Sequence, residues 1–218
     1  MFVSDTEFIT APCTCQAVKR AKRQMAQSGL AGLLDRCGFE GFSAETPWQQ
    51  DLKSLAEGYL AHVRSGGKSW LYLGGQPGCG KTHLCTAVCA GLLNDGVPVK
   101  YMLWTDQVQR IKADINDSDA LDELLEPLKT VPVLYVDDLF KGPPGPAPNP
   151  SAADLRLAFE ILNMRYVRQL TTLLSGEWDL SALLSLDQGT FSRVYQMAKG
   201  FTAFVGPDFA KNFRLREE

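Results

Sequence analysis

A glycine-rich stretch from Gly75 to Thr82, with the sequence GQPGCGKT, constrains this chain of 218 residues more than any other feature. It matches the pattern G-x-x-x-x-G-K-[ST] in full, and it lies between an apolar run (70–73) and a helix-forming run (83–90). In that context the glycines let backbone N–H groups face phosphate oxygens, and the helix N-terminus adds its dipole. A turn that matches by chance would not account for the two flanking runs. The stretch therefore predicts a phosphate-binding loop in an α/β protein.

The residue types of this loop predict its contacts with a nucleotide. Lys81 is expected to reach the β- and γ-phosphates, and Thr82 is expected to ligate Mg²⁺. The residues expected to contact ATP or ADP are Gly75, Gln76, Pro77, Gly78, Cys79, Gly80, Lys81, Thr82 and His83.

The composition, with 45% hydrophobic and 22% charged residues, is that of an ordinary globular protein. A net charge of −3 argues against strong non-specific binding of nucleic acid by the whole surface, although a local basic groove stays open. The basic run Lys19–Arg23 lies in an expected helix (16–27) and favours a solvated face over a DNA contact. The first residues do not resemble a signal peptide, and no apolar run is long enough to cross a bilayer. We therefore expect a cytoplasmic protein without membrane association.

The cysteines indicate buried thiols rather than disulfides. Cys85 and Cys89 lie four residues apart on the helix after the loop, so we expect them to face the sheet. Cys79 occupies a variable loop position, which suggests an accessible thiol. Cys13 and Cys15 look like half of a zinc site, but no C-x-x-C precedes them, so a complete site within this chain is not expected.

Helix-like and strand-like segments alternate along the chain, which predicts a mostly parallel sheet flanked by helices. The expected strands are 70–74, 97–104, 131–136 and 171–175, with a terminal hairpin from 201 onward. The expected helices are 48–64, 83–94, 105–114, 121–128, 151–170, 180–186 and 190–199. A proline-rich segment (141–150) should be an exposed loop beside the nucleotide site, and either a partner-docking loop or a tolerated insertion would fit it.

Two acids at the end of an apolar strand supply the second chemical signal. Asp137 follows Val133–Val136 and fits the Mg²⁺-organising Asp of P-loop NTPases, which acts through water. Asp138 is expected to polarise the attacking water, at a position where related ATPases usually carry Glu. Because Asp is one methylene shorter, we expect slow turnover. The alternative is that both are surface acids at a strand end.

Polar residues in the last third of the chain are candidates for sensing the γ-phosphate. Ser175 or Glu177, at the end of a strand, is the sensor candidate, although neither is the usual Asn. Arg193 lies on a short helix beyond that strand, where it can serve as an arginine finger toward a neighbouring subunit. Arg165 is a lesser candidate for that role. A surface ion pair is the alternative for either arginine.

These motifs together resemble the DnaC/DnaI-type AAA+ helicase loaders, especially the loader-like ATPases of phages and mobile elements. The segments that carry the resemblance are GQPGCGKTHL (75–84), YMLW (101–104), VLYVDDLFK (133–141), TLLSGEW (172–178) and SRVYQMAKG (192–200). The resemblance runs from about residue 13 to the C-terminus. It implies a P-loop fold of AAA+ type (48–218) behind a short helical N-terminal extension (1–47), the remnant of a zinc-domain linker.

The resemblance also implies a function. The family's ATP switch binds a DnaB-type hexameric replicative helicase and helps to place it on single-stranded DNA, with ATP acting between subunits of an oligomer. Carried over by residue, Lys81 and Thr82 bind phosphate and Mg²⁺, Asp137 is the Walker B acid, and Arg193 is the first Arg of the arginine-finger helix. Three features depart from the family: Met197 replaces a further Arg, the sensor Asn is missing, and only the closing pair of the N-terminal zinc domain is present.

Other functions remain open from the sequence. The IstB-like transposition helper ATPases are related, but the SGEW and SRVYQM strings favour a loader. A small-molecule P-loop kinase would need an Arg-rich lid, which we do not find. A nucleotide-gated binding module with little hydrolysis fits Asp138 and the missing sensor Asn. Basic residues near the C-terminus, Lys199, Lys211 and Arg214, are candidates for DNA contact, and a position facing the nucleotide is the alternative for Arg214.

Overall fold

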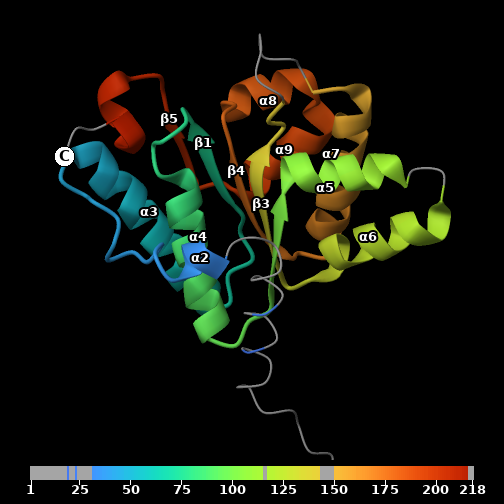
Figure 1. The fold of residues 1–218 in the computed structure, drawn as a ribbon, viewed down its shortest axis with the longest axis horizontal. Helices are drawn as coiled ribbons and strands as arrows, with labels where there is room; N and C mark the ends of the chain where they lie inside the picture. Colours follow the sequence, from blue (N-terminus) through green and yellow to red (C-terminus); the bar gives the residue numbers. More distant parts are fainter. Residues whose placement is uncertain (1–18, 20–22, 24–30, 115–116, 143–149, 216–218) are drawn as a thin grey trace, which may run out of the picture.

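The residues that the structure describes fold around one five-stranded sheet in which every strand runs parallel to its neighbours (Figure 1). The computed structural model describes residues 19, 23, 31–114, 117–142 and 150–215. The strand order is β2-β3-β4-β1-β5. The strands are β1 (Leu71–Gly75), β2 (Val99–Leu103), β3 (Val133–Leu139), β4 (Thr171–Gly176) and β5 (Thr202–Val205). The predicted α/β fold with a parallel sheet is confirmed.

Helices cover both faces of the sheet (Figure 1). One face is covered by α3 (Pro47–Arg64) and α4 (Lys81–Asn94), with the short α2 (Ala31–Leu34) against α4. The other face is covered by α5 (Trp104–Ala113), α6 (Ser118–Thr130), α7 (Ala152–Val167), α8 (Leu180–Leu186) and α9 (Gln188–Met197). Because both faces are covered, β1 and β4 are buried along their whole length.

Local signals in the sequence explain where several helices begin. Asp117, Ser151, Asp179 and Asp187 each precede a helix and accept hydrogen bonds from its first N–H groups. Helix α4 begins differently, because Gly80 adopts a left-handed conformation (φ 94°) directly before Lys81. The phosphate loop thus leads straight into the first turn of α4.

The expected terminal hairpin is wrong. Strand β5 pairs in parallel with β1, with Tyr72 opposite Thr202, and the chain then forms two 3-10 helices, η2 (Phe209–Lys211) and η3 (Phe213–Leu215). Gly206 and Pro207 follow β5, and Asp208 donates a backbone hydrogen bond to the side chain of Gln76. The C-terminal residues therefore turn toward the phosphate loop instead of pairing with β5.

Some expectations fall on residues outside the described ranges. These are Cys13 and Cys15, most of the basic helix 16–27, of which Lys19 and Arg23 are helical, and the proline-rich residues 143–149. Within the described ranges, no helix combines the length and apolar character needed to cross a membrane.

Candidate nucleotide site

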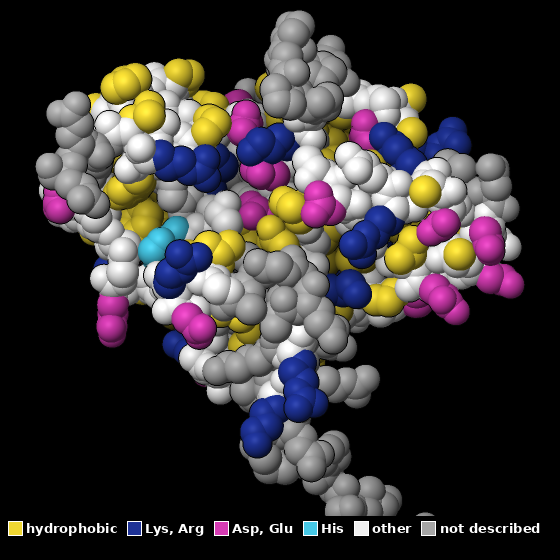
Figure 2. All heavy atoms as spheres, viewed as in Figure 1, with side chains coloured by type: hydrophobic (Ala, Val, Ile, Leu, Met, Phe, Trp, Pro, Cys, Tyr) yellow, Lys and Arg dark blue, Asp and Glu magenta, His cyan; other side chains and the backbone are white. Residues whose placement is uncertain are grey.

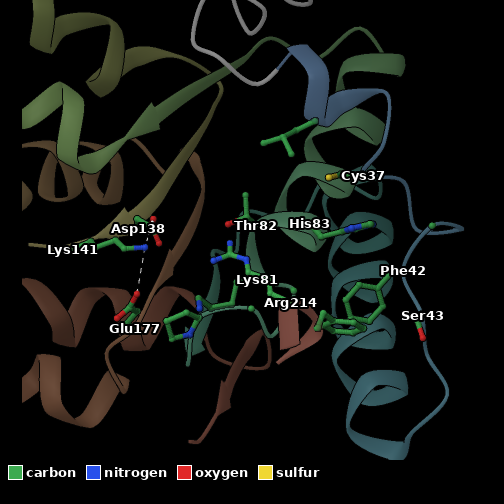
Figure 3. Close-up of a pocket in the computed structure, with 16 residues that line it drawn as sticks. Cys37, Phe42, Ser43, Lys81, Thr82, His83, Asp138, Lys141, Glu177 and Arg214 are labelled. Carbon is green, nitrogen blue, oxygen red and sulfur yellow. Dashed lines mark hydrogen bonds and ion pairs between the residues drawn. The ribbon is translucent and has the colours of Figure 1, made fainter. Parts of the chain in front are cut away.

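The carboxyl ends of β1, β3 and β4 meet at a cavity of about 440 Å³ (Figure 3). Ligands of open α/β sheets bind at this edge of the sheet. The lining residues are Leu33, Cys37, Gly41, Phe42, Ser43, Pro77, Gly78, Gly80, Lys81, Thr82, His83, Asp138, Lys141, Glu177, Phe213 and Arg214. Six of the nine residues expected to contact a nucleotide line the cavity: Pro77, Gly78, Gly80, Lys81, Thr82 and His83.

The phosphate loop requires glycine where the backbone turns. Gly75 has a φ of 132°, and a Cβ atom there would lie 2.3 Å from the carbonyl oxygen of Val205. Lys81 is almost fully buried, and its Nζ donates to the carbonyl oxygens of Gly75 at 2.8 Å and Gln76 at 2.9 Å. The ammonium group is therefore held against the loop, at the start of α4, where a phosphate would meet it.

Asp137 lies at the end of β3 with 4% of its surface exposed and accepts four hydrogen bonds. Its Oδ1 accepts from the backbone N–H of Asp138 at 3.1 Å, from Thr82 Oγ1 at 3.2 Å and from the hydroxyl of Ser175. Its Oδ2 accepts from the hydroxyl of Tyr101 at 3.1 Å. Burial raises the pKa of Tyr101, and the negative charge of Asp137 raises it further.

The pairing of Thr82 with Asp137 suits Mg²⁺ that arrives with a nucleotide. Hydroxyl and carboxylate oxygens are the protein ligands that Mg²⁺ prefers, and it usually needs only one or two of them beside substrate phosphates. Within the described part of the chain, no group of three or more His, Cys, Asp or Glu side chains is placed to hold a metal by itself. These residues therefore fit a nucleotide-bound metal rather than a site made by protein alone.

Asp138 lies at a local irregularity of β3. The pairing of β3 with β4 shifts register between Val136 and Leu139, and Asp138 has a φ of 53°, a left-handed value that is uncommon for a non-glycine residue. Its carboxylate accepts a hydrogen bond from Lys141 Nζ at 2.9 Å, and Lys141 also lies 3.4 Å from Glu177. Glu177, one of the two sensor candidates, thus lines the cavity, whereas Ser175 is buried against Asp137.

Residues distant in sequence close the opposite wall of the cavity. Phe42 makes edge contacts with His83 and Phe213, at ring-centroid distances of 5.5 and 5.4 Å. The backbone N–H of Phe213 donates to the carbonyl of Gly78 at 2.8 Å. Arg214 lines the cavity, which is the second of the two placements considered for it.

Sequence reasoning missed this wall, together with Tyr101 and Lys141. The segment 1–47 carries little core signal, yet Cys37 and Phe42 are buried. The aromatic residues Phe42 and Phe213 were the available signal, but nothing local indicates that they meet. Tyr101 and Lys141 lie within segments used for the family resemblance, YMLW and VLYVDDLFK, which carry no role for either residue.

Arg165 cannot serve as an arginine finger, which corrects that expectation. Its side chain is fully buried and donates to the Thr172 hydroxyl and to the carbonyls of Leu128, Val131 and Thr171. Burial lowers its pKa to about 9, from an ordinary value of 12.5. Its guanidinium is therefore a structural link inside the domain.

Arg193 lies on the surface of α9, outside the lining of the nucleotide cavity. Its guanidinium lies over two aromatic rings of α7, 5.8 Å from the centroid of Phe159 and 5.6 Å from that of Tyr166. It also donates to the carbonyl of Gly189. Arg193 is therefore packed against α7 and is not part of the cavity lining.

The cysteines differ from expectation at one position. Cys85 and Cys89 are buried, as predicted. Cys79 is also fully buried, so the expected accessible thiol is wrong. Burial raises the pKa of Cys79, despite an opposing effect from the nearby charge of Lys81.

A comparison with known families decides the relationship of the chain. A family model described as IstB-like ATP binding protein matches residues 10–181. The chain belongs to the family of IstB-like ATP-binding proteins. Members of this family are nucleotide-binding proteins, and they are ATPases in general.

Among curated proteins, this IstB-like protein is similar to phage-element proteins and helicase loaders. It is 32% identical over 212 residues to the phage-like element PBSX protein XkdC of Bacillus subtilis (strain 168), which covers 93% of the chain and 77% of XkdC. It is 30% identical over 121 residues to the replicative helicase loader DnaC of Escherichia coli (strain K12). That match covers 55% of the chain and 49% of DnaC, so it spans about half of the loader.

Solved structures of the same fold include DnaI and the DnaC helicase loader. The crystal structure of DnaI gives a TM-score of 0.60 at 22% identity, covering 80% of this chain and 89% of DnaI. The crystal structure of the DnaC helicase loader gives a TM-score of 0.64 at 20% identity, covering 79% of this chain and 97% of the DnaC chain. At these identities the likeness shows the fold alone, which is the AAA+ P-loop fold. The resemblance to DnaC/DnaI-type loaders is confirmed.

Proposed function

We propose that this IstB-like protein is an ATP-dependent helicase loader. It binds a DnaB-type hexameric replicative helicase and assists its placement on single-stranded DNA, with ATP binding and hydrolysis as the switch. The observation that carries this proposal is the cavity in which the phosphate loop faces the acidic end of β3. The relative named as a replicative helicase loader supports the choice of partner.

The residues of the candidate site have different roles toward ATP. Backbone N–H groups of the loop hold the phosphates, and Lys81 neutralises charge on the β- and γ-phosphates. Thr82 and Asp137 would hold Mg²⁺, which would supply positive charge to stabilise the phosphate oxygens. Asp138 orients the attacking water. Its short side chain makes turnover slow in the isolated protein.

Self-association supplies each nucleotide site with an arginine from the neighbouring subunit. Arg193 does not line the cavity of its own chain, so we propose that it acts on ATP bound by a neighbouring subunit in a self-associated complex. On the face drawn in Figure 2, basic and acidic side chains lie side by side instead of in separate fields. Binding of single-stranded DNA therefore depends on local basic residues, with Lys199 and Lys211 as candidates, and should weaken with salt.

Capture of the helicase tests the proposal. The tagged protein is mixed with its cognate replicative helicase in ATP, in ADP and without nucleotide, and the bound helicase is quantified. We expect capture that depends on the nucleotide state and is lost in Lys81→Ala. Lys68→Ala, a substitution of an exposed lysine outside the cavity, is the matched control. Equal absence of capture in all states, with intact ATP binding, would contradict the proposal.

A transposition helper ATPase is the second candidate, because the matching family model carries the IstB name. The same capture experiment with a transposase in place of the helicase separates the two functions. A nucleotide-gated module with little hydrolysis is recognised if capture follows the nucleotide state while no phosphate is released.

A further inference from the structure

Lys141 joins the two acidic side chains on one side of the nucleotide cavity. Figure 3 shows its side chain between Asp138 and Glu177, across the cavity from Lys81 and Thr82. The distances from Nζ are 2.9 Å to Asp138 Oδ2 and 3.4 Å to Glu177 Oε1. These side chains come from the end of β3, the turn that follows it and the end of β4. The ammonium group thus links two neighbouring strand ends at the reaction site.

The backbone fixes Lys141 beside Asp138. The N–H of Lys141 donates to the carbonyl of Asp138 at 2.9 Å and closes a tight turn. Inside that turn Phe140 has a φ of 59°, a strained value for an aromatic residue. Phe140 is held there by edge contacts with Trp104 and Phe191, at ring-centroid distances of 5.0 and 5.8 Å. Strained backbone persists where surrounding packing holds it, and it gathers at functional sites.

The pairing works against the proposed role of Asp138. A carboxylate that polarises water must offer an oxygen to that water in the right direction. In this structure the ammonium of Lys141 occupies Oδ2 and fixes the side chain. Burial alone would lower the pKa of Lys141, but the hydrogen bond and charge of Asp138, with the charge of Glu177, raise it. Lys141 therefore stays charged at neutral pH and keeps hold of the acid.

Space for an alternative position of Lys141 lies next to the cavity. A second cavity of about 510 Å³ adjoins the first, and Lys141 lines both of them. Its side chain is 40% exposed, so a rotation of the four-carbon stem does not require the core to open. Lys141 is therefore placed to leave Asp138 without disturbing the sheet.

We propose that Lys141 is a positioning residue that restrains Asp138 in the resting protein and must release it before ATP is hydrolysed. This inference rests on the proposed function, because it assigns the restraint to the hydrolysis step of the same site. It predicts that the slow turnover of the isolated protein is partly imposed by the Asp138–Lys141 pair.

Steady-state hydrolysis by variants of the full chain tests the restraint. In Lys141→Gln we expect kcat to rise about two- to fivefold, the size expected on releasing a partly exposed ion pair. The KM for ATP should stay within about twofold, since the phosphate loop is untouched. Lys141→Arg keeps the charge and should keep the low kcat. Lys129→Gln breaks an ion pair with Glu160 away from the cavity and is the matched control.

Glu177→Gln distinguishes a restraint from a structural role. This substitution removes one of the two carboxylates that share Lys141, so Lys141 remains with Asp138 and kcat should not rise. A general loosening of the turn would instead change both variants in the same direction. A fall or no change of kcat in Lys141→Gln, no hydrolysis in either wild type or Lys141→Gln, or a rise in Glu177→Gln would each overturn the proposal.

Helicase capture by the same variants separates this inference from the loader function. If Lys141→Gln still captures the helicase but its kcat does not rise, the proposed restraint by Lys141 is wrong and the loader function is not affected. If kcat rises in Lys141→Gln but neither the wild type nor the variant captures the helicase, the loader function is wrong and the proposed restraint is supported.

Discussion

The ammonium group of Lys81 donates hydrogen bonds to two carbonyl groups of its own loop, at 2.8 and 2.9 Å. A bound phosphate would offer it a charged acceptor in their place. Charge-assisted hydrogen bonds contribute about 1.5–3 kcal/mol, so we expect Lys81→Ala to weaken ATP binding about 10- to 100-fold. Titration calorimetry measures the loss, and Lys68→Ala should bind ATP as the wild type does. Unchanged affinity in Lys81→Ala would exclude the loop as the phosphate site.

Burial controls the chemistry of Cys79. Since burial raises its pKa, the thiolate forms only at a higher pH than in an exposed cysteine, and the thiolate is the nucleophile. At about pH 8 we expect iodoacetamide to alkylate Cys79 much more slowly in the folded protein than in the unfolded chain. Mass spectrometry of the labelled peptide follows the reaction. Equal rates in the two states would contradict the buried position.

At the scale of elements, Arg165 ties α7 to the C-terminal end of α6, to the residue that follows α6 and to the start of β4. Its guanidinium donates to three carbonyl groups, those of Leu128, Val131 and Thr171. Arg165→Met fills a similar volume but leaves these buried acceptors without their donor. We expect the free energy of unfolding to fall by about 2–4 kcal/mol. Urea denaturation followed by circular dichroism provides the measurement.

The same variant also tests the structural role of Arg165 directly. An Arg165→Met protein of full stability would contradict the buried link that this guanidinium makes inside the domain. Arg156→Met is the matched control, because it changes an exposed arginine of the same helix.

The strands and most helices could be predicted because their signals are local. The apolar runs end at Gly, Pro and Asp, and the capping residues Ser151 and Asp187 stand where helices begin. The partner of β5 could not be predicted, since pairing in parallel with β1 depends on contacts across the whole chain. The wall made by Phe42 and Phe213 escaped prediction for the same reason.

In the candidate site, too, some residues have local signals in the sequence and others depend on contacts across the chain. The loop and the two acids follow from a motif and from an apolar strand. Asp138 lines the cavity with the loop, and Asp137 is buried beside it with a hydrogen bond from Thr82. Tyr101 was not expected, because only the register of β2 against β3 brings its hydroxyl to Asp137. The position of Lys141 could not be predicted, because it depends on the turn at the end of β3. Asp138 and Phe140 adopt left-handed conformations there, although neither is glycine.

At the scale of the whole molecule, Arg193 and the nucleotide cavity belong to different surfaces. Residues that act between subunits affect turnover only where subunits meet. We expect Arg193→Ala to retain the ATP affinity of the wild type and to lose the rise in specific ATPase activity with protein concentration. The fall should reach at least tenfold at the highest concentration, because arginine fingers contribute about 10³-fold or more to turnover.

A second substitution on the surface of α9 distinguishes the positive charge of Arg193 from a contribution to subunit contact. Tyr195→Ala changes an exposed aromatic residue of α9 without removing a cation. It should assemble more weakly but regain full activity at higher concentration, whereas Arg193→Ala should not. An Arg193→Ala protein with wild-type activity at every concentration would remove the trans-acting arginine from the account.

In the proposed function, ATP lets this protein place a replicative helicase on single-stranded DNA. The most direct measurement mixes protein, helicase and a single-stranded DNA circle coated with single-strand binding protein, isolates the circles and quantifies the helicase that remains on them. The account predicts helicase on the circles with ATP and wild-type protein, and background levels with ADP or with Lys81→Ala. Equal helicase on the circles with and without this protein would contradict it.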